Sequence, residues 1–430
     1  MKPLASSTRL PRFTAWAAAM FSALVSMAQA ATPLPTGTPQ QTGFSAEGLQ
    51  RLDQFFAREI NGKRVPGAVV AIARDGKLVH YKAYGQRDPA TGAPMTLDSV
   101  FALASMTKIF TSVAALQLTE DGRLPLRTPV AEVFPGFASM KVGVAQPDGT
   151  LKLVDPTRPI FIHDLFRHTS GLTYGGRGDH PIAKHYPHGT QPPYEGDTQA
   201  FIQTLTQLPL AHQPGTVFEY SFSTDVLGAV VEKVSGKRLG AYLQDKVWRP
   251  LQMKNTGFEL TESFKTRAAH AFANNPLDGK PQSIPIIEKQ TQFDCGGACA
   301  MGTVGDYLRF GQMLLNGGTL DGRRYLSRTT VALMTSDHLG SRIATPVQPG
   351  ELLMGVQGYT FGLGFMVRQG AGIAGVHGSE GDYAWGGYGG TFFWVDPKEQ
   401  LIGVLMAQTP GASRQYYRRM IKTLVYQALN

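Results

Sequence analysis

One serine and one lysine, three residues apart, are the first candidates for chemistry in this chain. Ser105 and Lys108 lie in Leu103-Ala104-Ser105-Met106-Thr107-Lys108, at the start of a stretch, Thr107–Glu120, that lacks Gly and Pro and ends at Asp121-Gly122. This pattern predicts a helix stopped by a glycine. Residues three apart share a helix face, so the lysine amine should reach the serine oxygen. A serine hydroxyl needs such a neighbouring base to become a nucleophile.

The spacing alone also fits a surface serine that caps a helix beside an unrelated lysine. The apolar run Ala102-Leu103-Ala104 argues against a solvated cap. Other hydrolase sites are not indicated, because the chain after its leader has neither Gly-x-Ser-x-Gly nor His-Glu-x-x-His. Three histidines, His180, His185 and His188, fall in a Gly- and Pro-rich loop expected over residues 173–196. We expect them to face solvent and to bind no metal, and the alternative is that this loop overhangs the pocket and shapes specificity.

The elements that must position this pair form two groups. Near the N-terminus we predict a helix capped by Ser45 that runs to Ile60, followed by a hairpin of Val69–Ala73 with Leu78–Tyr84. Near the C-terminus we predict a hairpin of Phe392–Val395 with Leu401–Ala407, followed by a helix at Arg414–Leu429. Helices are predicted in the middle at Phe161–Phe166, Thr198–Gln207, Thr224–Lys233 and Leu239–Val247. The pattern indicates a sheet part, about 31–104 and 290–430, interrupted by a mostly helical insert, about 105–289.

The N-terminus has the features of an export signal. Lys2, Arg9 and Arg12 precede an apolar stretch, Phe13–Met27, and Ala28-Gln29-Ala30 fits a small-x-small cleavage site. We therefore expect residues 1–30 to be removed after Ala30, leaving a periplasmic or secreted protein without stable membrane insertion. A membrane anchor is the alternative, although the stretch is shorter than the roughly 20 residues that a span needs.

Composition indicates a loop-rich globular enzyme. The 430 residues are 42% hydrophobic and 17% charged, with 49 Gly and 28 Pro. The leader holds three of the nine net positive charges, and the remaining excess is not gathered with aromatic residues, so no nucleic-acid partner is expected. Cys295 and Cys299 can form a small disulfide in an oxidising compartment or remain two reduced thiols. Without nearby paired histidines they do not indicate zinc.

Six ordered segments together resemble one family. From about Phe44 onward the chain resembles the serine β-lactamase and penicillin-binding protein superfamily, in the class C-like branch that includes the family VIII carboxylesterases. The matching segments are Pro66-Gly67-Ala68, Phe101–Lys108, His163–Leu172, Phe218-Glu219-Tyr220-Ser221, Asp306–Phe310 and Trp385-Gly386-Gly387. The resemblance implies an α+β, β-lactamase/transpeptidase-like fold, in which helices flank an antiparallel sheet and a mostly helical subdomain is inserted.

The resemblance also assigns roles to residues. It makes Ser105 the acylated serine, Lys108 its partner and Tyr220 the tyrosine that accepts the serine proton and returns it to the leaving alkoxide. The backbone N–H groups of Ser105 and Tyr388 would form the oxyanion hole. His168 or Ser170 could be taken for a member of a catalytic triad, but we expect both residues to be structural. His377 could line the mouth of the pocket, with no role assigned.

Two departures from the β-lactamase pattern favour an esterase. Phe222 replaces the asparagine of the Tyr-x-Asn motif, and Trp385 replaces the lysine of the Lys-Thr-Gly motif. Both make the pocket more apolar, while Gly386 and Gly387 would let substrate lie close to an edge strand. We therefore predict hydrolysis of small, largely apolar esters without a cofactor or metal. A β-lactamase, D-amino peptidase or amide hydrolase is the first alternative, and an inactive cell-envelope binding protein is the second.

Overall fold

The computed structural model describes residues 33–177, 180–188, 196–284 and 290–430. The predicted export signal lies outside these ranges. None of the helices within them combines the length and the hydropathy needed to cross a membrane.

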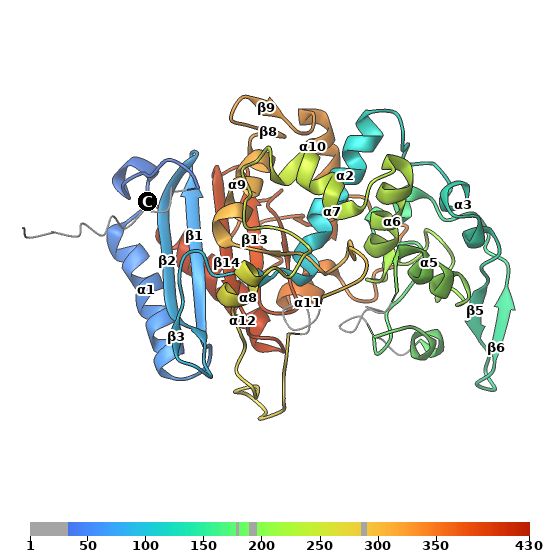
Figure 1. Cartoon of the computed structure of the whole chain (residues 1–430), viewed down its shortest axis with the longest axis horizontal. Coiled ribbons are helices and arrows are strands. Elements are labelled where there is room, and N and C mark those ends of the chain that lie inside the picture. Colours follow the sequence, from blue (N-terminus) through green and yellow to red (C-terminus); the bar gives the residue numbers. More distant parts are fainter. Residues whose placement is uncertain (1–32, 178–179, 189–195, 285–289) are drawn as a thin grey trace, which may run out of the picture. The chain divides into compact units, whose positions relative to one another are not determined.

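An eight-stranded antiparallel sheet, built from strands near both ends of the chain, forms the sheet part of the structure (Figure 1). Its strand order is β10-β11-β12-β13-β14-β1-β2-β3, so the predicted N-terminal and C-terminal hairpins join where β1 pairs with β14, from Ala68 opposite Ala407 to Arg74 opposite Leu401. The strands are β1 (Gly67–Arg74), β2 (Lys77–Asp88), β3 (Ala93–Pro94), β10 (Tyr359–Phe361), β11 (Met366–Arg368), β12 (Tyr383–Gly386), β13 (Phe392–Asp396) and β14 (Leu401–Ala407).

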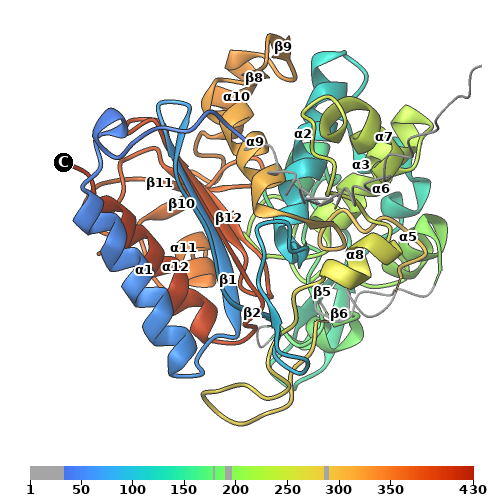
Figure 2. The same ribbon diagram turned by 60° about the vertical axis from the view of Figure 1, so that its left-hand side comes forward.

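Helices cover both faces of this sheet, which explains why β1 and β14 read as unbroken apolar runs rather than as alternating ones. On one face α1 (Ala46–Asn61) packs against α12 (Ser413–Tyr426) and β2, and Figure 2 shows the two helices side by side. On the other face α9 (Val304–Leu315) packs on β1, β13 and β14. Ser45 caps α1 as predicted, since its hydroxyl accepts a hydrogen bond from the Gly48 N–H at 3.2 Å.

The helical part is built around α2, whose bounds, Thr107–Glu120, are those predicted. It packs against α6 (Ser223–Ser235), and most of its residues are buried. Gly122, at φ 72°, follows the helix end in the left-handed conformation that glycine tolerates. The remaining helices are α3 (Val130–Val133), α4 (Ile162–Phe166), α5 (Thr198–Thr206), α7 (Leu239–Leu243), α8 (Glu262–Arg267), α10 (Arg328–Met334) and α11 (Pro349–Met354).

Several elements differ from the prediction. The helix expected over Leu239–Val247 ends at Leu243 and continues as a π-helical turn, Gln244–Trp248. The loop expected over 173–196 contains a 3-10 turn at Pro181–His185. Three two-stranded ribbons were not predicted: β4 (Phe101–Ala102) with β7 (Met301–Gly302), β5 (Val142–Ala145) with β6 (Leu151–Val154), and β8 (Thr319–Leu320) with β9 (Arg323–Arg324). Strands this short carry too few residues for a periodic pattern.

Candidate active site

The turn that carries Ser105 is held from several sides. Ser105 lies in a 3-10 turn, Ala104–Met106, between β4 and α2. The Leu103 N–H donates to the Ala300 carbonyl at 3.0 Å, and the Tyr307 hydroxyl donates to the Met106 carbonyl at 3.0 Å. Ala104 has φ 45°, a left-handed conformation that is unfavourable for alanine and persists only where the surroundings impose it. The serine is therefore presented at a fixed position.

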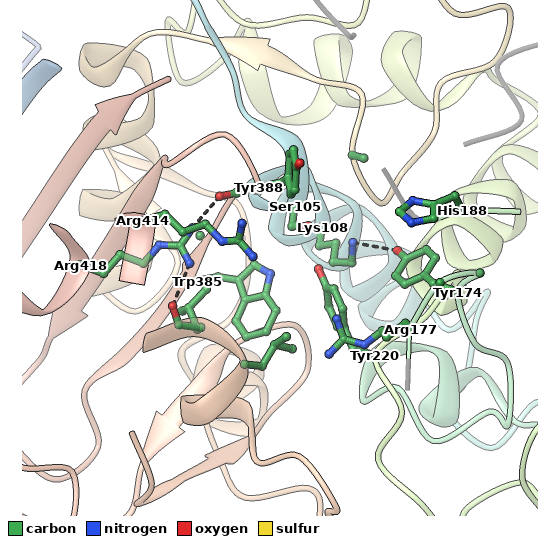
Figure 3. Close-up of a pocket in the computed structure, with 17 residues that line it drawn as sticks. Ser105, Lys108, Tyr174, Arg177, His188, Tyr220, Trp385, Tyr388, Arg414 and Arg418 are labelled. Carbon is green, nitrogen blue, oxygen red and sulfur yellow. Dashed lines mark hydrogen bonds between the residues drawn. The ribbon is translucent and has the colours of Figure 1, made fainter. Parts of the chain in front are cut away.

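Lys108 extends from the first turn of α2 into the same place. The side chain is 1% exposed, and its amine donates to the Gly297 carbonyl at 2.7 Å and to the Tyr174 hydroxyl at 3.4 Å. The amine also lies 4.7 Å from the centre of the Tyr220 ring. Figure 3 shows the lysine reaching toward both tyrosines. The structure thus brings Lys108 and Tyr220 together, as the resemblance implied, and adds Tyr174.

The acceptor for Lys108 belongs to a loop closed by a disulfide. Cys295 and Cys299 are bonded, with their Cα atoms 5.3 Å apart, so the structure has the disulfide rather than the two thiols. Within this loop the Gly296 carbonyl accepts a hydrogen bond from the Thr111 hydroxyl at 2.8 Å. The loop is therefore fixed to α2 as well as to itself, and it places the Gly297 carbonyl against the lysine.

Asp225 supports this arrangement from α6. Its carboxylate accepts a hydrogen bond from the Gly297 N–H at 2.9 Å. Burial raises the pKa of Asp225, and the nearby positive charge of Lys108 acts in the opposite direction. Sequence reasoning missed this residue, although it lies five positions after Tyr220 in a predicted helix.

Tyr220 is packed among rings rather than hydrogen-bonded. Its ring centre lies 4.6 Å from that of His168 and 5.5 Å from that of Trp385. Among the described residues its hydroxyl has no hydrogen-bond partner. The His168 Nδ1 accepts from the Ser221 N–H at 3.2 Å, and burial, followed by the charge of Lys108, lowers the pKa of this histidine well below its ordinary value. His168 is therefore neutral and holds the backbone beside Tyr220.

The Trp385-Gly386-Gly387 segment borders the site, but not on an edge strand. β12 lies inside the sheet, between β11 and β13. β11 pairs only with Tyr383 and Ala384 of β12. The later residues of β12, Trp385 and Gly386, therefore pair with β13 alone and have no partner strand on their other edge within the described ranges. A Cβ at Gly387 would overlap the Leu103 carbonyl oxygen, so glycine is needed for this close approach.

A cavity of about 250 Å³ joins these parts (Figure 3). Ser105 and Tyr388 both line it, and within the described ranges the Tyr388 N–H donates to no backbone carbonyl. The lining residues are Ser105, Lys108, Tyr174, Gly175, Gly176, Arg177, His188, Tyr220, Ala298, Leu352, Leu353, Trp385, Gly386, Gly387, Tyr388, Arg414 and Arg418.

Two residues expected at the cavity lie elsewhere. Phe222 does not line it, because its ring is buried behind Tyr174, with the ring centres 4.4 Å apart. The predicted contact between Phe222 and substrate is therefore not supported by the geometry. His377 is also absent from the lining and stacks on Tyr426 at 6.3 Å.

The cavity is also more cationic than predicted, because three arginines line it. Arg418 is buried and donates to the carbonyls of Leu353 at 2.8 Å, Gly387 at 2.5 Å and Thr391 at 3.3 Å. A signal was present in the sequence, since Arg414 and Arg418 are four apart in a predicted helix and so share a face. His188 lines the cavity as well, but no group of His, Cys, Asp or Glu in the described part of the chain is arranged to hold a metal ion.

Comparisons with known proteins agree with this geometry. The family model described as Beta-lactamase matches residues 52–425. Protein Rv1367c of Mycobacterium tuberculosis is 33% identical over 371 residues, covering 83% of this chain and 89% of that protein. Esterase EstB of Burkholderia gladioli is 29% identical, covering 86% of this chain and 93% of EstB. The solved structure of EstCE1, titled a hydrolase with promiscuous acyltransferase activity, superposes with a TM-score of 0.71 at 26% identity, covering 88% and 98% of the two chains.

Proposed function

The chain belongs to the beta-lactamase family, in the esterase branch of the serine β-lactamase and penicillin-binding protein superfamily, and we propose that it is a carboxylesterase acting through an acyl-Ser105 intermediate. The predicted fold is that of the family. The observation that carries the proposal is the buried Lys108 amine, 4.7 Å from the centre of the Tyr220 ring in the cavity that Ser105 lines.

The reaction proceeds in two acyl transfers. In the first, the Ser105 oxygen attacks the ester carbonyl carbon, while Tyr220, in its deprotonated form beside Lys108, accepts the serine proton on its phenolate oxygen. The carbonyl electron pair moves onto oxygen, where the N–H groups of Ser105 and Tyr388 stabilise the charge. When that pair returns, the bond to the alcohol breaks and the departing alkoxide takes the proton from Tyr220. Water then attacks the acyl-Ser105 by the same sequence, which releases the acid and restores the serine.

The cavity favours small substrates. Its volume of about 250 Å³ lies below the usual range for drug-sized ligands. Trp385, Leu352 and Leu353 offer apolar surface on one side of it. We propose that the apolar part of a short ester packs there, with its carbonyl directed at Ser105.

Replacing the nucleophile tests the proposal. Ser105→Ala should reduce hydrolysis of 4-nitrophenyl butyrate to the uncatalysed rate while circular dichroism shows an unchanged fold. Ser336→Ala removes an exposed serine outside the cavity and should leave the rate unchanged. Hydrolysis that survives in Ser105→Ala at the wild-type rate would refute the acyl-Ser105 mechanism.

A second candidate is a β-lactamase, D-amino peptidase or amide hydrolase with the same nucleophile. The arginines in the cavity favour a β-lactam or a peptide with a free C-terminus, because both carry a carboxylate. Turnover of a chromogenic cephalosporin measured beside 4-nitrophenyl butyrate separates the two. Efficient cephalosporin turnover with little ester hydrolysis would replace the carboxylesterase proposal.

We also propose that residues 1–30 direct export and that residues 31–430 form the mature hydrolase domain, with the sheet part and helical insert divided as predicted. Two observations support this: Pro33–Asn430 forms one compact unit, and the Cys295–Cys299 disulfide suits an oxidising compartment. N-terminal sequencing of the exported protein should begin at Ala31. A protein that keeps Met1 in the periplasm would contradict the cleavage site.

A further inference from the structure

The lining of the cavity that contains Ser105 carries an excess of cations. Its lining includes Lys108, Arg177, Arg414 and Arg418, and no Asp or Glu among the residues that the structure describes there. A concave site lined by one sign of charge raises the local concentration of ligands of the opposite sign. A neutral ester leaves this feature of the cavity unused.

Arg414 is the cation best placed to meet a ligand. It comes from the first turn of α12, is half-buried, and lies with its guanidinium carbon 5.2 Å from the centre of the Tyr388 ring. It forms no ion pair or hydrogen bond with any residue in the described ranges. Burial lowers the pKa of Arg414, the neighbouring Tyr388 acts in the opposite direction, and the positive charge of Arg177 lowers this pKa further. An anion placed here would relieve both costs.

Arg418 adds a second positive charge one turn further along α12. It is 2% exposed, and in the described part of the chain its charge is met by three carbonyl oxygens and by no carboxylate. Its Nε is buried without a hydrogen-bond partner among the same residues. A Cβ at Gly386 would lie 2.9 Å from this guanidinium, so the glycine admits the arginine beside the cavity.

Arg177 supplies charge from the opposite wall. Its guanidinium carbon lies 5.2 Å from the centre of the Tyr220 ring. Its Nε is 4.0 Å from a Glu219 oxygen, a distance too long for a hydrogen bond, so this pairing neutralises Arg177 only in part. Figure 3 shows Arg177 and Arg414 extending toward the cavity from different elements.

From this arrangement we propose that the cavity holds an anion subsite, centred on Arg414 with Arg418 behind it and Arg177 opposite. It selects esters that carry a second, ionised carboxylate, such as half-esters of short dicarboxylic acids. The subsite rests on the proposed function, because it gains its meaning by placing such an ester over Ser105. A guanidinium presents paired N–H donors that match a carboxylate. The positive charge of the subsite comes from Arg414 and Arg418 on α12 and from Arg177 in the loop after Tyr174. Trp385 occupies the strand position at which β-lactamases have a lysine.

The test compares two substrates of the same shape and different charge. Monoethyl adipate carries the carboxylate, and its carboxamide, ethyl 6-amino-6-oxohexanoate, is neutral. The wild type should hydrolyse the half-ester with a kcat/KM about ten- to a hundredfold above that of the carboxamide, as expected for hydrogen bonds to a charged group. This preference should shrink as salt is added, because the subsite is partly open to solvent.

Variants at Arg414 assign the preference to the subsite. Arg414→Gln should remove most of this preference, measured as the ratio of the two kcat/KM values, chiefly by raising KM for the half-ester. Arg414→Lys should restore part of it, because the charge returns without the paired donors. Arg342→Gln, which removes an exposed arginine outside the cavity, should leave the preference unchanged and so controls for net charge.

The outcomes separate this inference from the proposed function. If the wild type hydrolyses both substrates equally, or if Arg414→Gln keeps the full preference, the subsite is wrong and the esterase stands. Calorimetric binding of monoethyl adipate to Ser105→Ala gives a readout that needs no turnover. If the wild type hydrolyses no ester but this variant binds the half-ester and loses the binding when Arg414→Gln is added, the subsite stands and the esterase falls. Absence of that binding overturns the subsite.

Discussion

Removing one oxygen from Tyr220 should abolish most of the activity without weakening the fold. In Tyr220→Phe the ring keeps its packing against His168 and Trp385, at 4.6 and 5.5 Å between ring centres. The lost hydroxyl has no hydrogen-bond partner among the described residues, so its removal should leave the free energy of unfolding unchanged or raise it by about 1 kcal/mol. If this oxygen carries the proton, kcat should fall about 10²- to 10⁴-fold, equivalent to ~3–5 kcal/mol.

Tyr174 provides a matched control, because a second tyrosine hydroxyl lies 3.4 Å from the same amine. A hydrogen bond of this length is weak, so Tyr174→Phe should lower kcat by less than about tenfold. Initial rates with 4-nitrophenyl butyrate and urea unfolding would be measured for both variants. A loss of a hundredfold or more in Tyr174→Phe, with Tyr220→Phe still active, would show that the proton passes through Tyr174 instead.

Three further predictions concern the disulfide loop, the glycine segment and acid stability. Replacing both Cys295 and Cys299 by Ser should lower the free energy of unfolding in urea by about 2 kcal/mol. If the Lys108 amine takes part in catalysis, the same change should shift the pH profile of kcat, because the loop places the Gly297 carbonyl that accepts from this amine. An unchanged profile would contradict that role. Gly387→Ala should lower kcat about a hundredfold or more, because its Cβ would overlap the Leu103 carbonyl oxygen, two residues before Ser105. Gly372→Ala, in open space, should have no effect, and equal rates in the two variants would count against the close approach. Burial lowers the pKa of His80 to about 4, below its value in the unfolded chain. The contribution of the neutral His80 to the free energy of unfolding, about 3 kcal/mol, is therefore present above pH 6.5 and lost as the pH falls to about 4. A difference in the free energy of unfolding between wild type and His80→Gln that is the same at pH 7.5 and pH 4.5 would refute this.

The long elements could be predicted because their local patterns agree with their environments. Thr107–Glu120 lacks Gly and Pro and is followed by a glycine, so its bounds follow from the chain itself. The buried hairpin strands read as apolar runs bounded by turns. The interior position of β12 could not be predicted, because strand order depends on the pairing of β10 and β11, whose three residues each carry no clear period.

Some residues of the site could also be predicted from local spacing, whereas others depend on contacts between distant parts of the chain. Ser105 lies in the 3-10 turn directly before α2 and Lys108 in the first turn of α2, so their position in one cavity follows from their spacing, whereas Tyr220 required the family pattern. Lys108 meets the Gly297 carbonyl, 189 positions away, through a contact that no local pattern specifies. Phe222 was expected at the substrate because of its position in a motif, but the ring turns into the core behind Tyr174.

The acyl-Ser105 intermediate can be tested by locating the acyl group on the protein during turnover. The protein would be quenched with acid while hydrolysing 4-nitrophenyl butyrate and then mapped by peptide mass spectrometry. The acyl-Ser105 mechanism requires a butyryl increment on the peptide that contains Ser105, placed on that residue by fragmentation and absent from Ser105→Ala. A butyryl group on another residue that appears and decays at the rate of turnover would contradict it.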